Sequence, residues 1–250
     1  MKKTNYSYVG ISFIILVFGI IFIPRIVERF KSGDITRNER MSKSNIEDHK
    51  DSSSDKLSYL EINGERKTVP EFEFTDQNGK TITNLDYDGK VYVVEFFFTT
   101  CPTICPKMNF NLIQIQNYFK EYENDFGVAS FTINPVNDTA EVLKAYANKY
   151  GVTNPNWHLM TGDRDAIYEL ANQGFNIYVG KNDEAEGGFE HSGNFALIDK
   201  NGFIRSRKDA FGNPKIFYKG IVSEEEKMDE DGEEEEISML KEDIKKLLDE

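Results

Sequence analysis

The sequence predicts an α/β sandwich built around a mixed β-sheet. Three observations lead to this fold class. Residues 91–98 (VYVVEFFF) form a nearly continuous apolar run rich in strand-forming residues, as expected for a strand covered on both faces. Helix-like and strand-like segments then alternate from residue 109 to residue 173. Residues 194–207 end this series with two short strands around an Asp-Lys-Asn-Gly turn, which is typical of a β-hairpin.

The segments between the first strand and the hairpin follow a β-α-β order, which predicts parallel strands joined by helices. Residues 109–122 carry apolar residues three to four positions apart, so a helix is expected there. We further expect strands at residues 127–135 and 157–160, helices at 139–150 and 164–173, and an inserted loop at 176–188.

The N-terminal segment is predicted to be a membrane anchor. Residues 8–23 are sixteen residues without a charge, slightly fewer than the roughly 20 that usually cross a bilayer. The sequence that follows lacks the small-residue pattern of a signal-peptide cleavage site, so we expect an uncleaved anchor within residues 1–30. A buried core helix is the weaker alternative because the segment is apolar on all faces. Lys2 and Lys3 favour a cytoplasmic N-terminus, whereas six basic residues between positions 25 and 43 favour the opposite orientation.

The remainder divides by composition into a linker, a domain and a tail. Residues 31–56 are rich in Ser, Asp, Asn, Lys and Arg and are expected to form a flexible linker. The folded domain is expected at residues 57–222. Residues 223–250 are expected to form an acidic tail, and residues 237–248 within it carry one apolar stripe typical of an amphipathic helix. We interpret this segment as a solvated tail, and packing of its helix on the domain stays open.

The charge distribution argues against a nucleic-acid partner. The formal net charge is -13, and residues 224–236 contain ten acidic residues and one lysine, so the remaining body is only mildly acidic. Binding of nucleic acid needs a basic face that neutralises phosphates, and neither part of the chain supplies one.

Cys101 and Cys105 are the strongest candidates for a functional site. They are the two cysteines of the chain and are separated by three residues. Cys101 follows the predicted buried strand, and Pro106 suits the first position of the next helix, so Cys105 is expected at or near the helix N-cap. The positive potential of a helix N-terminus stabilises thiolate, which attacks disulfides and binds soft metals. A structural disulfide or a pair of buried thiols is the alternative.

The chain contains three histidines that could complete a metal site. His49 lies in the expected linker, and His158 begins a predicted strand, where a packed or surface histidine is expected. His191 lies between a loop and a strand near the end of the domain, and its position alone leaves a surface histidine equally open. Two thiolates and one imidazole suit Cu(I) and can accept Cu(II). Zinc is the competing metal, but a closed four-ligand site would have to recruit His158 or His49.

Several segments together resemble the SCO (SenC) family of cytochrome oxidase assembly proteins. In chain order they are FFFTTCPTICPKM, FTINPVNDT, LKAYANKYGV followed by WHLMTG, and EHSGNFALIDKNG, within residues 69–221. The resemblance implies a thioredoxin-like three-layer sandwich with a mixed sheet, tethered by one N-terminal transmembrane helix. It implies that Cys101, Cys105 and His191 hold copper. The implied role is delivery of copper to, or reduction of thiols at, the dinuclear copper site of cytochrome c oxidase. The copper-site subunit of that oxidase and a thiol reductant are then the expected partners.

The resemblance also implies a location outside the cytosol. The lack of an Arg-rich presequence favours the inner membrane of a bacterium, with the C-terminal domain on the periplasmic side. In such a compartment the two thiols tend to oxidise, and oxidised thiols cannot bind copper. The chain departs from the family at Asn134, where many relatives have Asp before proline, while Asp138 is retained. The acidic tail lies outside the resemblance.

Two functions remain open on this basis. A metallochaperone binds and transfers copper without turnover and depends on His191. A thiol–disulfide oxidoreductase attacks a partner with one cysteine and resolves the mixed disulfide with the other, so His191 has little role. The residues leave open which cysteine is the more reactive.

Overall fold

The computed structural model describes residues 16, 18, 56–62, 64–208 and 213–250. The chain separates into two units, residues 1–51 and 52–250, and the fold given below belongs to the second unit. The expected anchor and linker lie outside the described residues, except for Leu16 and Phe18, which are helical, and Lys56. Within the described ranges, no helix is both long enough and apolar enough to span a bilayer.

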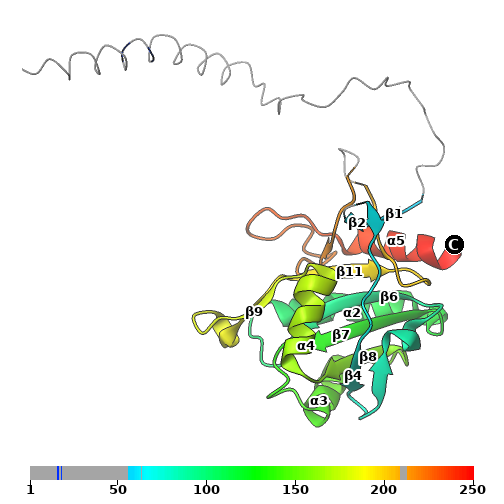
Figure 1. Cartoon of the computed structure of the whole chain (residues 1–250), viewed down its shortest axis with the longest axis vertical. Coiled ribbons are helices and arrows are strands. Elements are labelled where there is room, and N and C mark those ends of the chain that lie inside the picture. The colour runs from blue at the N-terminus through cyan, green and yellow to red at the C-terminus, as the bar shows by residue number, and fades with distance from the viewer. Residues whose placement is uncertain (1–15, 17, 19–55, 63, 209–212) are drawn as a thin grey trace, which may run out of the picture. The chain divides into compact units, whose positions relative to one another are not determined.

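A mixed sheet of nine strands forms the centre of the domain (Figure 1). The strands are β1 (Ser58–Tyr59), β4 (Glu73–Asp76), β5 (Thr81–Thr83), β6 (Val91–Phe97), β7 (Phe126–Thr132), β8 (Trp157–Thr161), β11 (Asn194–Ile198), β12 (Ile204–Ser206) and β13 (Tyr218–Lys219). Their order is β1-β12-β11-β6-β7-β8-β4-β5, with β13 paired to β11. The central pairs β6–β7 and β7–β8 are parallel, and the outer pairs are antiparallel. The predicted mixed sheet is thereby confirmed.

Helices and two small hairpins surround this sheet. The helices are α2 (Ile104–Tyr118), α3 (Ala140–Tyr150), α4 (Arg164–Glu169) and α5 (Ile237–Asp249). One hairpin pairs β2 (Glu61–Ile62) with β3 (Glu65–Arg66), and the other pairs β9 (Val179–Lys181) with β10 (Phe189–His191). Strand β9 lies inside residues 176–188, which the sequence analysis expected to be a loop.

The helix after the cysteines begins earlier than expected. It starts at Ile104, with Thr103 in the N-cap position, so Cys105 is the second residue of the first turn rather than the N-cap. Pro106 is the third helical residue. The shift costs no hydrogen bond, because the first four N–H groups of a helix have no partner within the helix.

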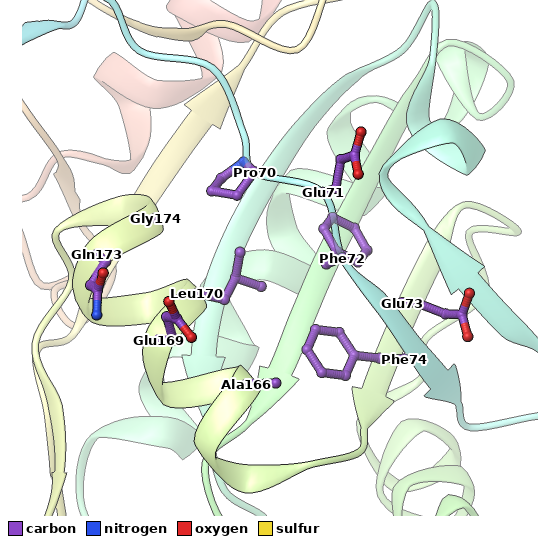
Figure 2. Close-up of a pocket in the computed structure, with 10 residues that line it drawn as sticks. All are labelled: Pro70, Glu71, Phe72, Glu73, Phe74, Ala166, Glu169, Leu170, Gln173 and Gly174. Atoms are coloured by element: carbon purple, nitrogen blue, oxygen red, sulfur yellow. The ribbon is translucent and has the colours of Figure 1, made fainter.

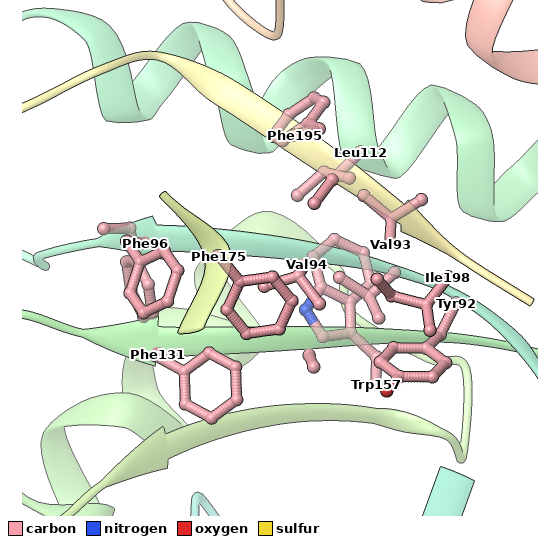
Figure 3. Close-up of a cluster of buried hydrophobic side chains, with 14 of the residues drawn as sticks. Tyr92, Val93, Val94, Phe96, Leu112, Phe131, Trp157, Phe175, Phe195 and Ile198 are labelled. Atoms are coloured by element: carbon pink, nitrogen blue, oxygen red, sulfur yellow. The ribbon is translucent and has the colours of Figure 1, made fainter. Parts of the chain in front are cut away.

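The side chains of β6 enter two separate packing layers. All seven residues of the strand are buried, which confirms the expectation of a strand covered on both faces. The ring of Phe96 packs against Phe131 and Phe175 at centroid distances of 5.3 and 5.9 Å. Figure 3 shows these rings on one side of the strands and Leu112 of α2 on the other. The strand that leads to Cys101 is therefore fixed from both faces.

The C-terminal helix is packed, so the interpretation of a solvated tail is wrong for this part of the chain. Helix α5 contacts α2, β6 and β13. Arg207 donates hydrogen bonds of 2.7 Å to both carboxylate oxygens of Asp243, and the hydroxyl of Tyr218 donates to the same carboxylate at 2.7 Å. The acidic residues 224–236 that precede α5 do not prevent this packing, because the apolar stripe of the helix removes four side chains from water. These four side chains are Ile237, Leu240, Ile244 and Leu247.

Candidate metal centre

The two cysteines lie where β6 passes into α2. Cys101 is on the connecting loop, and its N–H donates to the carbonyl of Phe98 at 3.2 Å, which closes a turn over residues 98–101. The Sγ atom of Cys101 accepts a hydrogen bond from the N–H of Cys105 at 3.5 Å. Thr103 makes no capping hydrogen bond with its side chain. The sulfur of Cys101 therefore accepts from one of the free amides at the helix N-terminus.

His191 reaches the cysteines from the end of β10. Its Nε2 atom is 3.3 Å from Sγ of Cys105 and 4.0 Å from Sγ of Cys101. The three ligand atoms all lie within 4.8 Å of one another. The structure thus brings together the three residues that the sequence analysis named as ligands, although His191 is separated from Cys101 by 90 positions.

Packing against Phe98 positions the hairpin that carries His191. The ring of Phe98 lies edge-on to the imidazole of His191, with centroids 5.7 Å apart, and 5.2 Å from the ring of Phe189. Gly187 approaches the same ring with φ of +84°, and a Cβ at this position would lie 2.8 Å from it. Only glycine combines this backbone conformation with so close an approach. Phe98 is the residue of this contact that the sequence analysis missed, because it is one of several similar residues in an apolar run.

The two thiols have opposite electrostatic environments. Hydrogen bonds from the Cys105 thiol, from His191 and from the N–H of Cys105 lower the pKa of Cys101 below the usual range of a thiol. Burial raises the pKa of Cys105 above that range, and the neighbouring Cys101 adds to this effect. The surroundings of the two thiols therefore favour the thiolate form at Cys101 and the protonated form at Cys105. Both thiols are free and buried, with Cys101 at 8% exposure and Cys105 at 0%.

The donor set fits a soft metal ion with three ligands. A trigonal ion with bonds of about 2.3 Å to sulfur would separate its donor atoms by roughly 4 Å. The distances given above need only small adjustments to reach this value. Across residues 56–62, 64–208 and 213–250, no carboxylate and no second imidazole joins the group. These three donors do not by themselves complete the four-ligand set of a closed zinc site.

The other two histidines do not join this centre. His158 lies on β8, where its Nδ1 atom is 3.0 Å from Oδ2 of Asp76 and its ring packs edge-on against Tyr87. It is the packed histidine that the sequence analysis expected. His49 lies outside the described residues. The Nδ1 atom of His191 is buried and has no hydrogen-bond partner among the described residues.

Two buried carboxyl groups were given no role from the sequence. Glu95 on β6 is 0% exposed, accepts a hydrogen bond of 2.7 Å from Ser130 through Oε1, and leaves Oε2 without a partner among the described residues. A lone acid within an apolar strand is the signal that could have found it. Asp138 is also 0% exposed and accepts hydrogen bonds from Thr99, just before Cys101. The carbonyl of Asn134 accepts a hydrogen bond from the N–H of Asp138 at 3.0 Å, within the segment between β7 and α3.

A hollow away from the thiols lies between β4 and α4 (Figure 2). Phe72, Phe74 and Leu170 form the apolar part of its lining, and Glu71 and Glu73 also line it. Its lining contains no cysteine and no histidine, so it does not share the donor chemistry of the thiol site.

The SCO1/SenC family matches residues 61–224, which is more than half of the chain. The chain belongs to the SCO1/SenC family. This SCO1/SenC chain is 32% identical over 157 residues to the SCO1 protein homolog of Bacillus subtilis, covering 62% of this chain and 80% of the relative. It is 27% identical over 144 residues to a protein of Stutzerimonas stutzeri named as copper-binding, covering 56% of this chain and 68% of that protein.

Solved structures confirm the thioredoxin-like fold of this SCO1/SenC chain. A SCO1/SenC family lipoprotein from Bacillus anthracis matches with a TM-score of 0.59 and 31% identity, over 72% of this chain and 95% of the lipoprotein. BsSco, described as a member of the Sco family of cytochrome c oxidase assembly proteins with a disulfide switch, matches with a TM-score of 0.58 and 27% identity. That match covers 73% of this chain and 94% of BsSco. The resemblance to the SCO (SenC) family is confirmed.

Proposed function

We propose that this chain is a copper-binding chaperone for the assembly of cytochrome c oxidase. Cys101, Cys105 and His191 hold the copper ion, which is the cargo of the protein. The observation that carries the proposal is the convergence of two sulfurs and one imidazole nitrogen within 4.8 Å. This donor set prefers copper, because soft thiolates select Cu(I) and the imidazole also suits Cu(II).

The named relatives support both parts of the proposal. The Stutzerimonas stutzeri protein is named as copper-binding, and BsSco is described as a member of a family that assembles cytochrome c oxidase. We propose that this chain passes its copper to the copper-site subunit of the oxidase. The chain either delivers copper to that site or prepares its thiols, and a thiol reductant keeps Cys101 and Cys105 able to bind the ion.

The proposal includes a membrane tether. Residues 1–30 form the anchor, residues 31–56 the linker, residues 57–222 the copper-binding domain, and residues 223–250 a C-terminal extension that ends in α5. The uncharged run at residues 8–23 supports the anchor. The Bacillus anthracis relative is described as a lipoprotein, a different means of membrane attachment. We place the domain on the periplasmic side of a bacterial cytoplasmic membrane, where free thiols need a reductant.

The proposal is tested by copper titration of the full chain in detergent. The reduced chain is expected to take up one Cu(I) per chain in competition with a chelator. The chain with a Cys101–Cys105 disulfide is expected to take up none, because a disulfide removes both thiolates. Equal uptake by the two forms would contradict the ligand assignment. The Cu(II) form is expected to show a thiolate-to-copper charge-transfer band.

A thiol–disulfide oxidoreductase is the second candidate, and the opposite environments of the two thiols favour it. The Cys101 thiolate attacks a partner disulfide, forms a mixed disulfide and releases one partner thiolate. Cys105 then gives up its proton and attacks the Cys101 sulfur, which releases the second partner thiol. The partner is reduced by two electrons and the chain is oxidised to the Cys101–Cys105 disulfide, which the thiol reductant must reopen.

The trapping behaviour of two serine variants tests this second candidate. Cys105→Ser keeps the attacking thiolate and removes the resolving thiol, so it is expected to accumulate a mixed disulfide with glutathione disulfide used as the probe. Cys101→Ser is the matched control and is expected to form little, because the remaining thiol is buried and protonated. Non-reducing mass spectrometry measures both products. Equal trapping by the two variants would show that Cys101 is not the attacking residue.

A further inference from the structure

Asp138 is a buried carboxylate whose hydrogen bonds reach the loop that carries Cys101. Its side chain is 0% exposed. The Oδ2 atom accepts from the N–H of Thr99 at 3.0 Å and from the hydroxyl of Thr132. The Oδ1 atom accepts from the hydroxyl of Thr99 and from the amide of Asn137 at 2.8 Å. Four donors therefore meet one carboxylate, and two of them belong to Thr99.

Thr99 lies in the thiol loop, which is the segment between β6 and α2 that carries Cys101. It is the second residue of the turn that the Cys101 N–H closes on the carbonyl of Phe98. The carboxylate holds Thr99 through its backbone and its side chain at once, which fixes the direction in which the chain leaves β6. Thr132 ends β7, so the same carboxylate also joins this turn to the neighbouring strand. A shift of the turn would move the Cys101 sulfur away from the N–H of Cys105.

The position of Asp138 next to a helix does not explain its hydrogen bonds. It precedes α3, where a carboxylate often caps the helix N-terminus. The cap of α3 is made by Thr139, whose side chain accepts from the N–H of Val142. Both oxygens of Asp138 are instead directed to groups at the ends of β6 and β7 and to Asn137.

We infer that Asp138 is a positioning residue for the thiol site. By holding Thr99 it keeps the Cys101 sulfur at the N-terminus of α2 and opposite His191. It thereby sets the reactivity of the thiol pair and the geometry of the copper ligands. The copper part of this inference rests on the proposed function, whereas the part that concerns the thiols stands without a metal.

Three variants of the full chain in detergent test the inference. Asp138→Ala removes the carboxylate. Thr99→Val removes one donor from the thiol loop and keeps the backbone hydrogen bond, so it tests the inference even if the first variant does not fold. Thr132→Val is the matched control, because it removes a hydroxyl donor to the same carboxylate from β7 and not from the thiol loop.

Two readouts need no metal. One is the rate at which iodoacetamide alkylates Cys101, and the other is the equilibrium in which glutathione disulfide oxidises the two thiols and yields two glutathione molecules. Thr99→Val and Asp138→Ala are each expected to change both the alkylation rate and the glutathione equilibrium by about tenfold or more. This magnitude is similar to the loss of a residue that hydrogen-bonds to a metal ligand. Thr132→Val is expected to change them by less than about twofold, although its thermal stability falls as much as that of Thr99→Val.

Equal effects of Thr99→Val and Thr132→Val on both readouts would overturn the inference, and so would wild-type values in folded Asp138→Ala. The copper arm records the charge-transfer band of the Cu(II) form, which is expected to shift in Thr99→Val and to stay unchanged in Thr132→Val. If the wild-type chain binds no copper, the proposed function fails, and the role of Asp138 is decided by the alkylation rate and the glutathione equilibrium.

Discussion

Replacing His191 with alanine is expected to weaken Cu(I) binding by more than about 100-fold, because loss of a ligand should exceed the 10–100-fold effect of losing an outer partner of a ligand. The imidazole nitrogen lies 3.3 Å from one sulfur and 4.0 Å from the other. No further Cys, His, Asp or Glu among the described residues joins this group, so none is placed to take over its bond. Competition with a Cu(I) chelator measures the affinity.

His158→Ala is the matched control for this prediction. His158 is also largely buried, but it lies on β8 against Asp76 and Tyr87, away from the cysteines. Its removal is expected to leave copper affinity unchanged while lowering stability. The His191→Ala chain should still form the Cys101–Cys105 disulfide, because both sulfurs remain. Copper affinity that is the same in wild type and His191→Ala would remove the imidazole from the ligand set.

Glu95→Gln is expected to abolish a loss of stability that the wild-type chain undergoes as pH rises. Burial raises the pKa of Glu95 to about 7 from 4.5, because its charged form is desolvated in the core and only Ser130 donates to it. The folded state therefore holds this proton more tightly than the unfolded state. The contribution of Glu95 to the free energy of unfolding is therefore fully present below pH 4.5 and is lost as the pH rises through about 7. This pKa shift corresponds to a change of about 3 kcal/mol in the free energy of unfolding.

Urea unfolding at pH 5, 6.5 and 8 measures this effect. Trp157, the single tryptophan, donates its indole N–H to Ser130 at 3.0 Å and so reports on the surroundings of Glu95 by its fluorescence. The difference in unfolding free energy between Glu95→Gln and wild type should move in favour of the variant by about 2.5 kcal/mol between pH 5 and pH 8, because part of the effect already occurs below pH 5. Glu121→Gln on the surface is the control. A difference that does not change with pH would show that Glu95 remains ionised in the folded chain.

The site was only partly predictable from the sequence, and the parts differ in physical origin. Cys101 and Cys105 could be identified because they are close in the chain, follow a buried strand and precede a helix. The position of His191 left a ligand and a surface histidine equally open, because β9, the strand that pairs with β10, lies in a segment expected to be a loop. The resemblance of EHSGNFALIDKNG to the family singled out His191, and the hairpin packed on Phe98 places its imidazole beside the sulfurs.

The apolar runs and their spacing determined the mixed sheet and its central parallel strands, since local periodicity reflects which faces of an element are covered. The family was indicated by the resemblance of the motifs around Cys101, Cys105 and His191 and not by this periodicity. The sequence also determined the thiol pair at a strand end. Only the tertiary structure decided which cysteine has the lowered pKa, because the difference arises from contacts of Cys101 with the first turn of α2 and with His191, and from complete burial of Cys105. It also decided that α5 packs on the domain and that Asp138 holds the turn before Cys101. These outcomes depend on groups that are distant in the chain and meet only in the folded domain.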